Sequence, residues 1–276
     1  MRLFLPEGNP DGIKVVEKSN WNGSGLVVPR ALLPAAKARA ELARAGVYVL
    51  AGQDGESPLT RVYVGEGDPV RPRLEAHAKA KDFWTHVVLF ISKDQNLNKA
   101  HVQHLEARLV ALAAASKRCL LDNGNTPQTP SLSESDVADV DGFLDDILLC
   151  LPILGFTYFE PAPAPIRGET EILINAKGVV ARGYQSPQGL VVRKGSQAAR
   201  TATAAIAGYL AETRAQLIQQ GVLSEAGAAL EFTQDYSFGS PSTAAGVVLG
   251  RSSNGRIEWK TGDGRTLKSL QDSELE

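Results

Sequence analysis

Two short segments of the chain alternate valine with tyrosine, and each has a glycine at its edge. They read GVYVL at 46–50 and VYVG at 62–65. Because successive side chains of a strand point to opposite faces, each segment predicts a strand with one apolar and one phenolic face. The intervening AGQDGESPLT is rich in turn formers, which predicts a β-hairpin. In a suitable register, Tyr48 and Tyr63 would lie on one surface.

The residues around the hairpin predict further strands and helices. Runs of β-branched and aromatic residues predict strands, and apolar residues at helical spacing predict helices. In the helix expected after the hairpin, Arg73 and His77 are four residues apart and therefore share a face. Asn98 is the expected cap of the next helix. The predicted elements are strands near 2–5, 13–17 and 83–92, and helices over 31–45 (interrupted by Pro34), 67–82 and 97–118.

An acidic segment separates the two halves of the chain. Residues 126–165 hold no Lys or Arg and 7 Asp or Glu, whereas residues 1–125 hold 17 Lys or Arg against 13 Asp or Glu, a net of +4. Ser133 is a candidate cap for an amphipathic helix over 134–151. The apolar seam of this helix predicts docking on the first domain or, as the alternative, dimerisation. The PAPAP run at 161–165 predicts a stiff linker.

The rear of the chain predicts a second domain. EILIN, VVARGY and GLVVRKG predict three strands, TATAAIAGYLAETRAQLIQQ and STAAGVVL predict two helices, and turn dipeptides flank RIEWKT. Trp259, Tyr236 and Phe238 are either core aromatics of this domain or surfaces that stack on a base. Trp21, near the start of the chain, is likewise either a core residue or a partner contact. The predicted fold class is α+β, with a small three-stranded antiparallel sheet flanked by helices and a second small α+β domain.

Composition narrows the class of protein. The 276 residues are 43% hydrophobic and 22% charged, which is typical of a globular protein. The most apolar stretch, ILLCLPILGF at 147–156, is about half the roughly 20 residues that a membrane span needs. No secretory signal pattern is visible, and Cys119 and Cys150 have neither zinc-site nor CxxC spacing. These features predict a cytoplasmic protein without a membrane partner.

Glu106 departs from the pattern of its helix. At 100° per residue it falls between Val102 and Ala113, inside the apolar stripe. A carboxylate at such a position needs a cation, which is either Arg73, in a structural salt bridge, or a divalent metal ion. Together with two phenols and a histidine, these residues form an inventory for phosphodiester hydrolysis.

This set of residues resembles the GIY-YIG nuclease superfamily. GVY at 46–48 and YVG at 63–65 match its two signature triplets, with valine in place of isoleucine in both. Arg73 and His77 follow in one helix and Glu106 in the next. The resemblance implies a GIY-YIG-like nuclease domain at 46–125, preceded by an N-terminal strand and helix arm at 1–45 and followed by an acidic helix with a Pro-rich linker at 126–167 and a C-terminal α+β accessory domain at 168–276.

The resemblance implies roles in proton transfer for three residues. Tyr48 would take the proton from the attacking water, Tyr63 would orient phosphate or water, and His77 would assist proton transfer near Tyr48. A phenol has an ordinary pKa near 10, so this mechanism needs nearby cations to favour the phenolate.

The resemblance also implies the residues that bind the phosphate and the metal. Arg73 would clamp the scissile phosphate, and Glu106 would bind one Mg²⁺ or Mn²⁺ ion that steadies the leaving oxygen. Gly65 and Asn123 are the further candidates for substrate binding, because they match the end of the second triplet and an asparagine that follows the glutamate helix.

The rear domain is similar to an uncharacterised module attached to GIY-YIG proteins, and to SPSxAA…NGxxxW modules of restriction and DNA-methylase proteins. The matching residues are SPSTAA at 240–245 and NGRIEW at 254–259, within a module at 168–270. The resemblance implies contact with DNA, although the near-neutral charge of this part predicts no strong phosphate footprint.

The sequence therefore predicts a metal-dependent endonuclease that hydrolyses DNA, in restriction, phage defence or mobile-element processing. The alternatives are a catalytically silent nucleic-acid-binding or assembly subunit, and a nuclease directed at RNA. A protein partner or self-association is expected through the helix at 134–151 or through the C-terminal domain.

Overall fold

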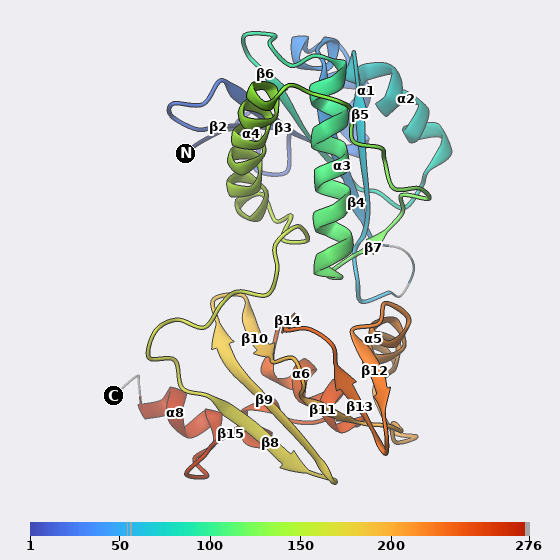
Figure 1. Cartoon of the computed structure of the whole chain (residues 1–276). Coiled ribbons are helices and arrows are strands. Elements are labelled where there is room, and N and C mark those ends of the chain that lie inside the picture. The colour runs from blue at the N-terminus through green and yellow to red at the C-terminus, as the bar shows by residue number, and fades with distance from the viewer. Residues whose placement is uncertain (54, 56, 274–276) are drawn as a thin grey trace. The chain divides into compact units, whose positions relative to one another are not determined.

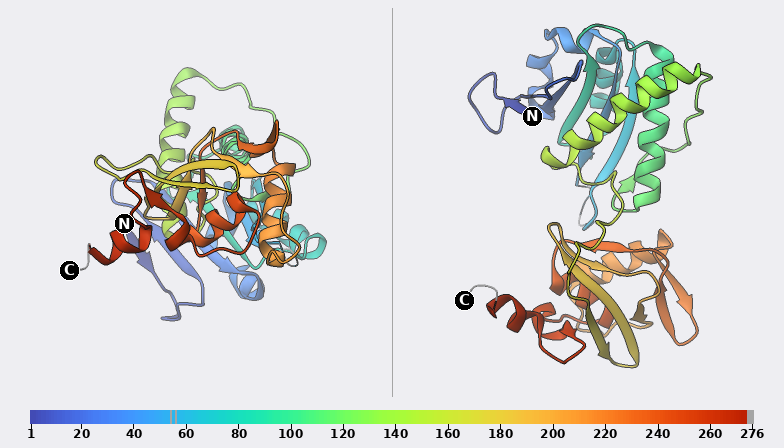
Figure 2. Two further views of the ribbon diagram at one scale, coloured as in Figure 1. Left: turned by 90° about the horizontal axis from the view of Figure 1, so that it is seen from below. Right: turned by 60° about the vertical axis from the view of Figure 1, so that its left-hand side comes forward.

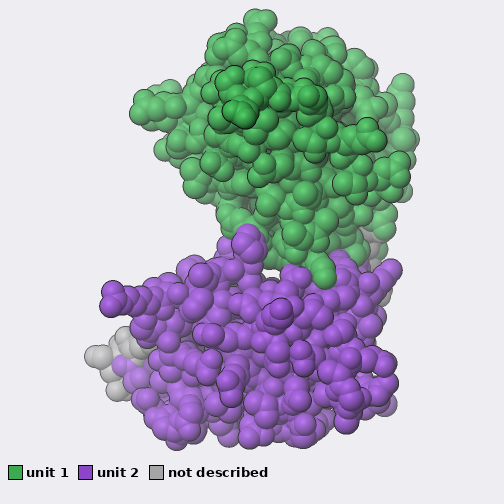
Figure 3. Space-filling model, viewed as in Figure 1, with its two compact units in different colours: residues 1–55, 59–160 green, residues 56–58, 161–276 purple. Residues whose placement is uncertain are grey.

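The computed structural model describes residues 1–53, 55 and 57–273. Positions 54 and 56 of the predicted hairpin loop, and 274–276 at the end of the predicted C-terminal domain, lie outside the described residues. The chain forms two compact units, which are described separately (Figure 3). Unit 1 comprises residues 1–55 and 59–160, and unit 2 comprises residues 56–58 and 161–276.

Unit 1 is built on one seven-stranded sheet with the strand order β1-β2-β3-β6-β4-β5-β7 (Figure 1). All neighbours are antiparallel except β5 and β7, which are parallel. The strands are β1 (Arg2–Phe4), β2 (Lys14–Glu17), β3 (Gly23–Pro29), β4 (Gly46–Gly52), β5 (Arg61–Gly67), β6 (His86–Ser92) and β7 (Leu120–Leu121).

The three predicted strands of the hairpin region are adjacent in this sheet, but the sheet is larger than the three strands predicted. Strand β3 was not predicted, because its sequence GSGLVVP looks like a continuation of the preceding turn. It pairs with β6 along all of its seven residues. Gly25 is required there, since a Cβ atom would lie 2.5 Å from Val16 Cγ1 and 2.7 Å from Phe90 Cε1. The first 45 residues therefore contribute three strands to the same sheet.

Helices cover both faces of the unit 1 sheet (Figures 1 and 2). The caps expected at Asn98 and Ser133 are confirmed, because each side chain accepts a hydrogen bond from the backbone N–H three residues later. The helix expected over 31–45 is wrong in extent, since it is broken into three short pieces. The elements are η1 (Arg30–Leu32), α1 (Leu33–Ala36), η2 (Ala40–Ala43), α2 (Val70–Ala80), α3 (Lys99–Ser116) and α4 (Glu134–Ile153).

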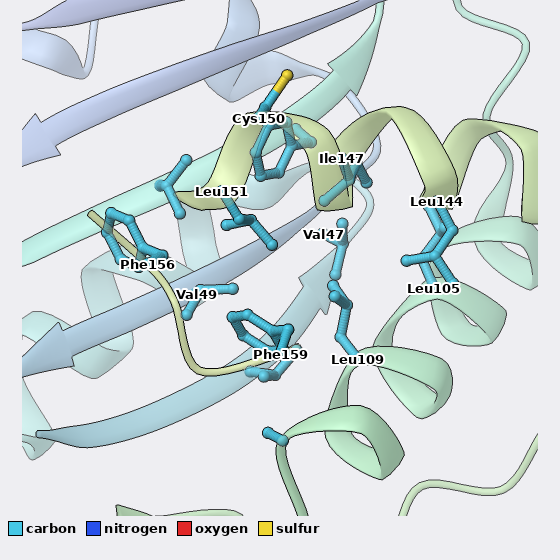
Figure 4. Packing of buried hydrophobic residues seen from close by; sticks show 14 of the residues in the cluster. Val47, Val49, Leu105, Leu109, Leu144, Ile147, Cys150, Leu151, Phe156 and Phe159 are labelled. Carbon is cyan, nitrogen blue, oxygen red and sulfur yellow. The ribbon is translucent and has the colours of Figure 1, made fainter. Parts of the chain in front are cut away.

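The acidic helix α4 docks on unit 1 through its apolar seam (Figure 4). Leu144, Ile147 and Leu151 are at most 2% exposed and share one core with Val47 and Val49 of β4. The predicted docking is therefore confirmed, and the seam is buried inside the unit. Trp21 belongs to the same core, is 7% exposed and has its ring centroid 5.1 Å from that of Phe143.

A second core lies on the opposite face of the sheet. Its members include Tyr48 and Leu50 of β4 together with Val70 and Leu74 of α2. The hairpin thus presents its valines to α3 and α4 and its phenolic face to α2, as the alternation of its side chains predicts.

Unit 2 has two antiparallel sheets and four helices in its described residues, which confirms an α+β fold. Trp259, Tyr236 and Phe238 are at most 4% exposed and belong to its core, so the core assignment of these aromatics is confirmed. The five-stranded sheet is ordered β14-β10-β9-β8-β15 and the three-stranded sheet β11-β13-β12. The elements are β8 (Ile172–Ala176), β9 (Val179–Ser186), β10 (Gly189–Val192), β11 (Gln197–Ala199), α5 (Gly208–Gln219), β12 (Leu223–Ala226), β13 (Ala229–Phe232), β14 (Tyr236–Phe238), α6 (Pro241–Leu249), α7 (Gly255–Glu258), β15 (Lys260–Thr261) and α8 (Leu267–Ser273).

The SPS and NGRIEW segments lock α6 to α7. The Gly255 N–H donates to Ser242 Oγ at 3.0 Å, and Trp259 Nε1 donates to the Pro241 carbonyl at 3.1 Å. A Cβ atom on Gly255 would lie 2.1 Å from the Pro241 carbonyl carbon, so only glycine fits. Asn254 caps α7. These contacts give the segments a structural role within unit 2.

Across the residues that the structure describes, no helix has both the length and the apolar character that a membrane crossing requires.

Candidate functional site

The two tyrosines of the hairpin lie together on one face, as predicted. Tyr63 is opposite Leu50 in the register, which places it diagonally from Tyr48, and their ring centroids are 6.4 Å apart. The His77 ring, on α2, lies 4.7 Å from that of Tyr63 and 5.9 Å from that of Tyr48. Three of the predicted site residues therefore form one aromatic cluster. Its walls come from β4, β5 and α2.

Two glycines of β5 make room for this cluster. Gly65 is the register partner of Tyr48, and a Cβ atom on it would lie 2.5 Å from the Tyr48 hydroxyl oxygen and 2.6 Å from Cζ. Gly67 lies under Arg73, whose Cγ would be 3.2 Å from an added Cβ. Gly65, predicted to bind substrate, thus has a packing role in this structure. The phenol of Tyr48 can cross β5 only because position 65 has no side chain.

Two carboxylates approach from the other face of the sheet. Glu106 lies on α3, which packs against β4 and β5 on the face opposite α2. Glu66 points to the same face as the valines of β5, and its two carboxylate oxygens lie 2.5 and 2.7 Å from Lys99 Nζ. Strand β7 pairs with β5 only at Arg61 and Val62. The remainder of the outer edge of β5 therefore lets groups from both faces meet near Gly65 and Gly67.

The side chain of Asn123 is hydrogen-bonded to the outer edge of β5. Its Oδ1 accepts from the Val64 N–H at 3.0 Å, and its Nδ2 donates to the Val64 carbonyl at 2.8 Å. The amide side chain therefore continues the hydrogen bonding of the sheet beyond β7. In this structure Asn123 supports the strand that carries the site, and its amide is occupied by the protein backbone.

Glu106 has a negative charge that the protein does not compensate by a direct contact. Within the described part of the chain, no hydrogen bond or ion pair within 4 Å holds its carboxylate, so the predicted salt bridge with Arg73 is not formed. Burial and the neighbouring charge of Glu66 raise the pKa of Glu106 to about 7, although Arg73 and Lys99 oppose this effect. At neutral pH the carboxylate would be stabilised by an additional cation.

The phenols and the histidine are held in their neutral forms. Burial raises the pKa of Tyr48 well above its usual value, and the neighbouring Tyr63 adds to this, while the Arg73 guanidinium opposes it. Burial also raises the pKa of Tyr63. The pKa of His77 is lowered to about 4, first by burial and then by the charges of Arg73 and Lys81. Burial therefore outweighs Arg73, so the cations of the chain do not by themselves favour the Tyr48 phenolate that the predicted mechanism needs.

Two polar atoms of the cluster are buried without a partner. Tyr48 is 0% exposed, and neither its hydroxyl nor His77 Nε2 has a hydrogen bond of acceptable geometry to any residue that the structure describes. Buried polar atoms in folded proteins normally have partners. These two atoms are therefore unsatisfied inside the cluster, with the Arg73 guanidinium close enough to act on the pKa of both groups.

The residues present fit one hard cation and do not form a complete cage for it. No group of three or more His, Cys, Asp and Glu side chains suited to a metal occurs among the described residues. Mg²⁺ is commonly held by one or two carboxylates with water and phosphate oxygens as the other ligands. The uncompensated carboxylate of Glu106, with Glu66 nearby, is a donor set of this kind.

Glu66 and Lys99 were missed as site residues in the sequence. The available signal was the strand alternation, which places Glu66, directly after YVG, on the same face as the valines that meet the Glu106 helix. Lys99, in the first turn of α3, could not be connected to it, because the pair is formed across 33 positions of the chain.

Comparison with known proteins gives one match. Residues 172–271, within unit 2, match a family described as "Domain of unknown function (DUF4357)". No curated protein and no solved structure matches the chain.

Proposed function

We propose that unit 1 is a GIY-YIG-type, metal-dependent nuclease domain that hydrolyses phosphodiester bonds of DNA. The observation that carries this proposal is the meeting of two phenols, an arginine and an uncompensated carboxylate at the edge of β5. Tyr48, Tyr63 and Arg73 reach it from one face and Glu106 from the other, and the charge of Glu106 acts on the pKa of both phenols. These residue types suit the binding of a phosphate and the activation of water.

Each side chain has a role that follows from its position. Arg73, whose stem packs on Gly67, binds the scissile phosphate and stabilises the charge that develops on it. The Tyr48 hydroxyl, buried and unpaired, would orient the attacking water and take its proton, with Arg73 as the cation of the chain that opposes the raised pKa of the phenol. Neutral His77 holds Tyr63 in place by ring contact at 4.7 Å.

Glu106 would hold one Mg²⁺ or Mn²⁺ ion together with water and phosphate oxygens, and the ion would supply Lewis-acid stabilisation of the phosphate oxygens when bound. The absence of an ion pair within 4 Å among the described residues supports this assignment, because a carboxylate whose oxygens no protein cation holds is available as a ligand.

A second candidate function is nucleic-acid binding without cleavage. The burial of Tyr48, at 0% exposure, and the upward shift of its pKa favour this alternative, because both oppose proton abstraction by the phenol. The two candidates share Arg73 as a phosphate contact and differ in whether Glu106 and Tyr48 are needed for a chemical step.

A nicking assay on supercoiled plasmid, with Mg²⁺ or Mn²⁺, separates the candidates. Cleavage is expected for the wild type and is expected to fall about 100-fold or more in Glu106→Gln and in Tyr48→Phe, which keeps the ring over Gly65. Glu134→Gln is the matched control, since it removes a carboxylate from an exposed position at the start of α4. Wild-type DNA binding without cleavage would favour the binding subunit, and cleavage that survives Glu106→Gln would reject the assignment.

A separate comparison of substrates tests whether DNA is the substrate. Duplex DNA, single-stranded DNA and single-stranded RNA of one sequence are compared in the same assay. Faster cleavage of RNA than of either DNA would replace the proposed substrate while keeping the nuclease assignment.

A further inference from the structure

A cavity of about 750 Å³ lies on the same face of the unit 1 sheet as the two phenols. Its lining includes four cationic side chains and two carboxylates, a net of +2, over an apolar floor that includes Phe4, Val15 and Ile91. The cations are those of Arg2, Arg39, Arg44 and Lys93. This "basic cavity" combines positive charge with aromatic and aliphatic surface, which suits a ligand that has both a phosphate and a base.

One row of paired residues connects the basic cavity to the site. Ser24 pairs with Ile91, Ile91 with Gly46, and Gly46 with Gly67, which underlies Arg73. All of these positions face the same side of the sheet as the two phenols. Gly46 is two residues from Tyr48 on β4, and Gly67 is four residues from Tyr63 on β5. Ile91 and Ser24 share this side because Ile91 pairs with Gly46 and Ser24 pairs with Ile91.

The length of this row sets the spacing between the two places. The near edge of the cavity, at Ile91 on β6, is two strands from Gly67 on β5, about 10 Å at the ~4.8 Å between neighbouring strands. Its far wall, at Arg2 and Phe4 on β1, is five strands from Gly67, about 24 Å. A stacked nucleic-acid strand rises about 3.4 Å per nucleotide. These distances correspond to about three to seven nucleotides.

Two of the four cations form no ion pair within 4 Å among the described residues, although the charge of Arg44 lowers the pKa of Glu41 and Arg2 is the register partner of Glu17. Arg39 lies 2.6 Å from Glu41, and Lys93 lies 3.5 Å from Glu17, whereas no ion pair engages Arg2 or Arg44.

Arg44 is also fixed in place. Its Nη1 donates to the carbonyls of Ser92 and Lys93 at 3.0 Å each, which orients the guanidinium without neutralising it. Its own carbonyl accepts from the N–H of Val70, the first residue of the helix that carries Arg73. Arg44 of the basic cavity is therefore linked by a backbone hydrogen bond to the first residue of α2, the helix that carries Arg73.

Phe4 supplies an accessible aromatic surface to the same cavity. It is 56% exposed, and it lies two residues from Arg2 on the same face of β1. Base stacking on an accessible aromatic ring is tolerant of sequence and needs no further polar group.

We propose that the basic cavity binds a nucleotide of the substrate strand about three to seven positions from the scissile phosphate, with its phosphate on Arg44 and Arg2 and its base against Phe4. The inference rests on the proposed function for the position of the scissile phosphate. It adds a second anchoring point that fixes the path of the strand across the sheet.

Binding of a fluorescein-labelled single-stranded DNA, measured by anisotropy in EDTA over a range of salt concentrations, tests the proposal. Arg44→Gln and Arg2→Gln are each expected to weaken binding about threefold to tenfold at low salt and to reduce the slope of log K against log salt by about 0.7. Phe4→Ala is expected to weaken binding about fivefold or more with the slope unchanged.

Lys14→Gln is the matched control, because it removes one positive charge from β2 on the opposite face, one residue before Val15. It is expected to leave affinity and slope within experimental error of the wild type. If Arg2→Gln and Phe4→Ala, both at exposed positions that do not hold the core, also behave like the wild type, the basic cavity does not contact the strand.

Competition by dAMP separates a nucleotide in a strand from a free nucleotide. A strand ligand predicts that millimolar dAMP displaces the labelled DNA weakly, whereas tight binding of dAMP that Phe4→Ala abolishes would replace the strand with a free nucleotide and overturn the proposal. Since the measurement needs no cleavage, a cavity-dependent affinity in a protein that does not nick plasmid would reject the nuclease assignment and keep the cavity. If nicking depends on Glu106 but the cavity variants bind DNA as the wild type does, the nuclease assignment stands and the proposal for the basic cavity is rejected.

Discussion

The hydroxyl oxygen of Tyr48 lies 2.5 Å from the point that a Cβ atom on Gly65 would occupy. The two residues are register partners on β4 and β5, so the phenol stands across the backbone of the neighbouring strand. The glycine that ends the YVG triplet is therefore needed by the tyrosine of the GVY triplet. The two triplets form one packing unit, and the position of the Tyr48 hydroxyl depends on both.

Replacing Gly65 by alanine is expected to displace the Tyr48 ring and to destabilise unit 1. The added methyl would overlap the hydroxyl, Cζ and Cε2 of Tyr48, and overpacking of this kind costs about 1 to 3 kcal/mol. Urea unfolding of Gly65→Ala measures the loss. Gly124→Ala is the matched control, since nothing lies within 4 Å of its added Cβ. Equal stability of the two variants would show that Tyr48 does not occupy this position.

Removing the charge of Glu106 is expected to stabilise the protein at alkaline pH. The folded-state pKa of Glu106 is raised to about 7 from an ordinary value of 4.5, so ionisation is penalised in the fold. The penalty is absent below about pH 4.5, where the carboxyl is protonated in both states, and is complete above about pH 7. For a half-buried group we expect Glu106→Gln to gain about 1 to 2 kcal/mol at pH 8 in EDTA.

The measurement is the free energy of unfolding of Glu106→Gln and wild type at pH 4 and pH 8. The two proteins are expected to be equally stable at pH 4 and to differ at pH 8. Glu134→Gln, at the exposed N-terminal turn of α4, is expected to show no gain at pH 8, since its charge favours the helix dipole. A gain for Glu106→Gln of the same size at both pH values would contradict the charge explanation.

Converting Asn123 to aspartate is expected to destabilise the outer edge of β5. The carboxylate keeps the acceptor for the Val64 N–H but places a second oxygen against the Val64 carbonyl, which loses its donor. A buried or half-buried acceptor left unpaired costs about 1 to 3 kcal/mol. Asn125→Asp, exposed in the same loop, makes the same change in charge and is expected to be neutral. Hydrogen exchange at Val64 is the direct readout, and unchanged protection in Asn123→Asp would show that the amide does not hold this edge.

In unit 2, Gly255→Ala is expected to separate α6 from α7. The added Cβ would lie 2.1 Å from both the carbonyl carbon and the oxygen of Pro241, which are backbone atoms that cannot rotate away. We expect a loss of about 3 kcal/mol or more, with red-shifted fluorescence as Trp259 loses its hydrogen bond to Pro241. Gly262→Ala, with open space around its added Cβ, serves as the control. A buried Trp259 emission that persists in Gly255→Ala would refute the role of this glycine.

The local sequence was enough to determine features whose geometry depends only on residues close together in the chain. The alternation in GVYVL and VYVG set the two faces of the hairpin, because side-chain direction in a strand follows from the backbone alone. The caps at Asn98 and Ser133 were predictable for the same reason, since each bond spans three residues. The stripe on the acidic helix likewise indicated a docking face, which Ile147 and Leu151 occupy in the fold.

Only the tertiary structure decided which of these elements pack together and how that packing changes the ionisation of their side chains. Strand β3, which begins Gly-Ser-Gly and ends in proline, has no local signal strong enough to distinguish it from a loop, and pairing with β6 is what makes it a strand. Glu66 and Glu106 become neighbours only because β5 and α3 pack together, and their combined burial and repulsion raise the pKa of Glu106. Desolvation and the approach of like charges depend on contacts between distant parts of the chain. The residue types at the site could therefore be predicted from the sequence, whereas their ionisation states, the packing role of Gly65 and the row that leads to the basic cavity could not.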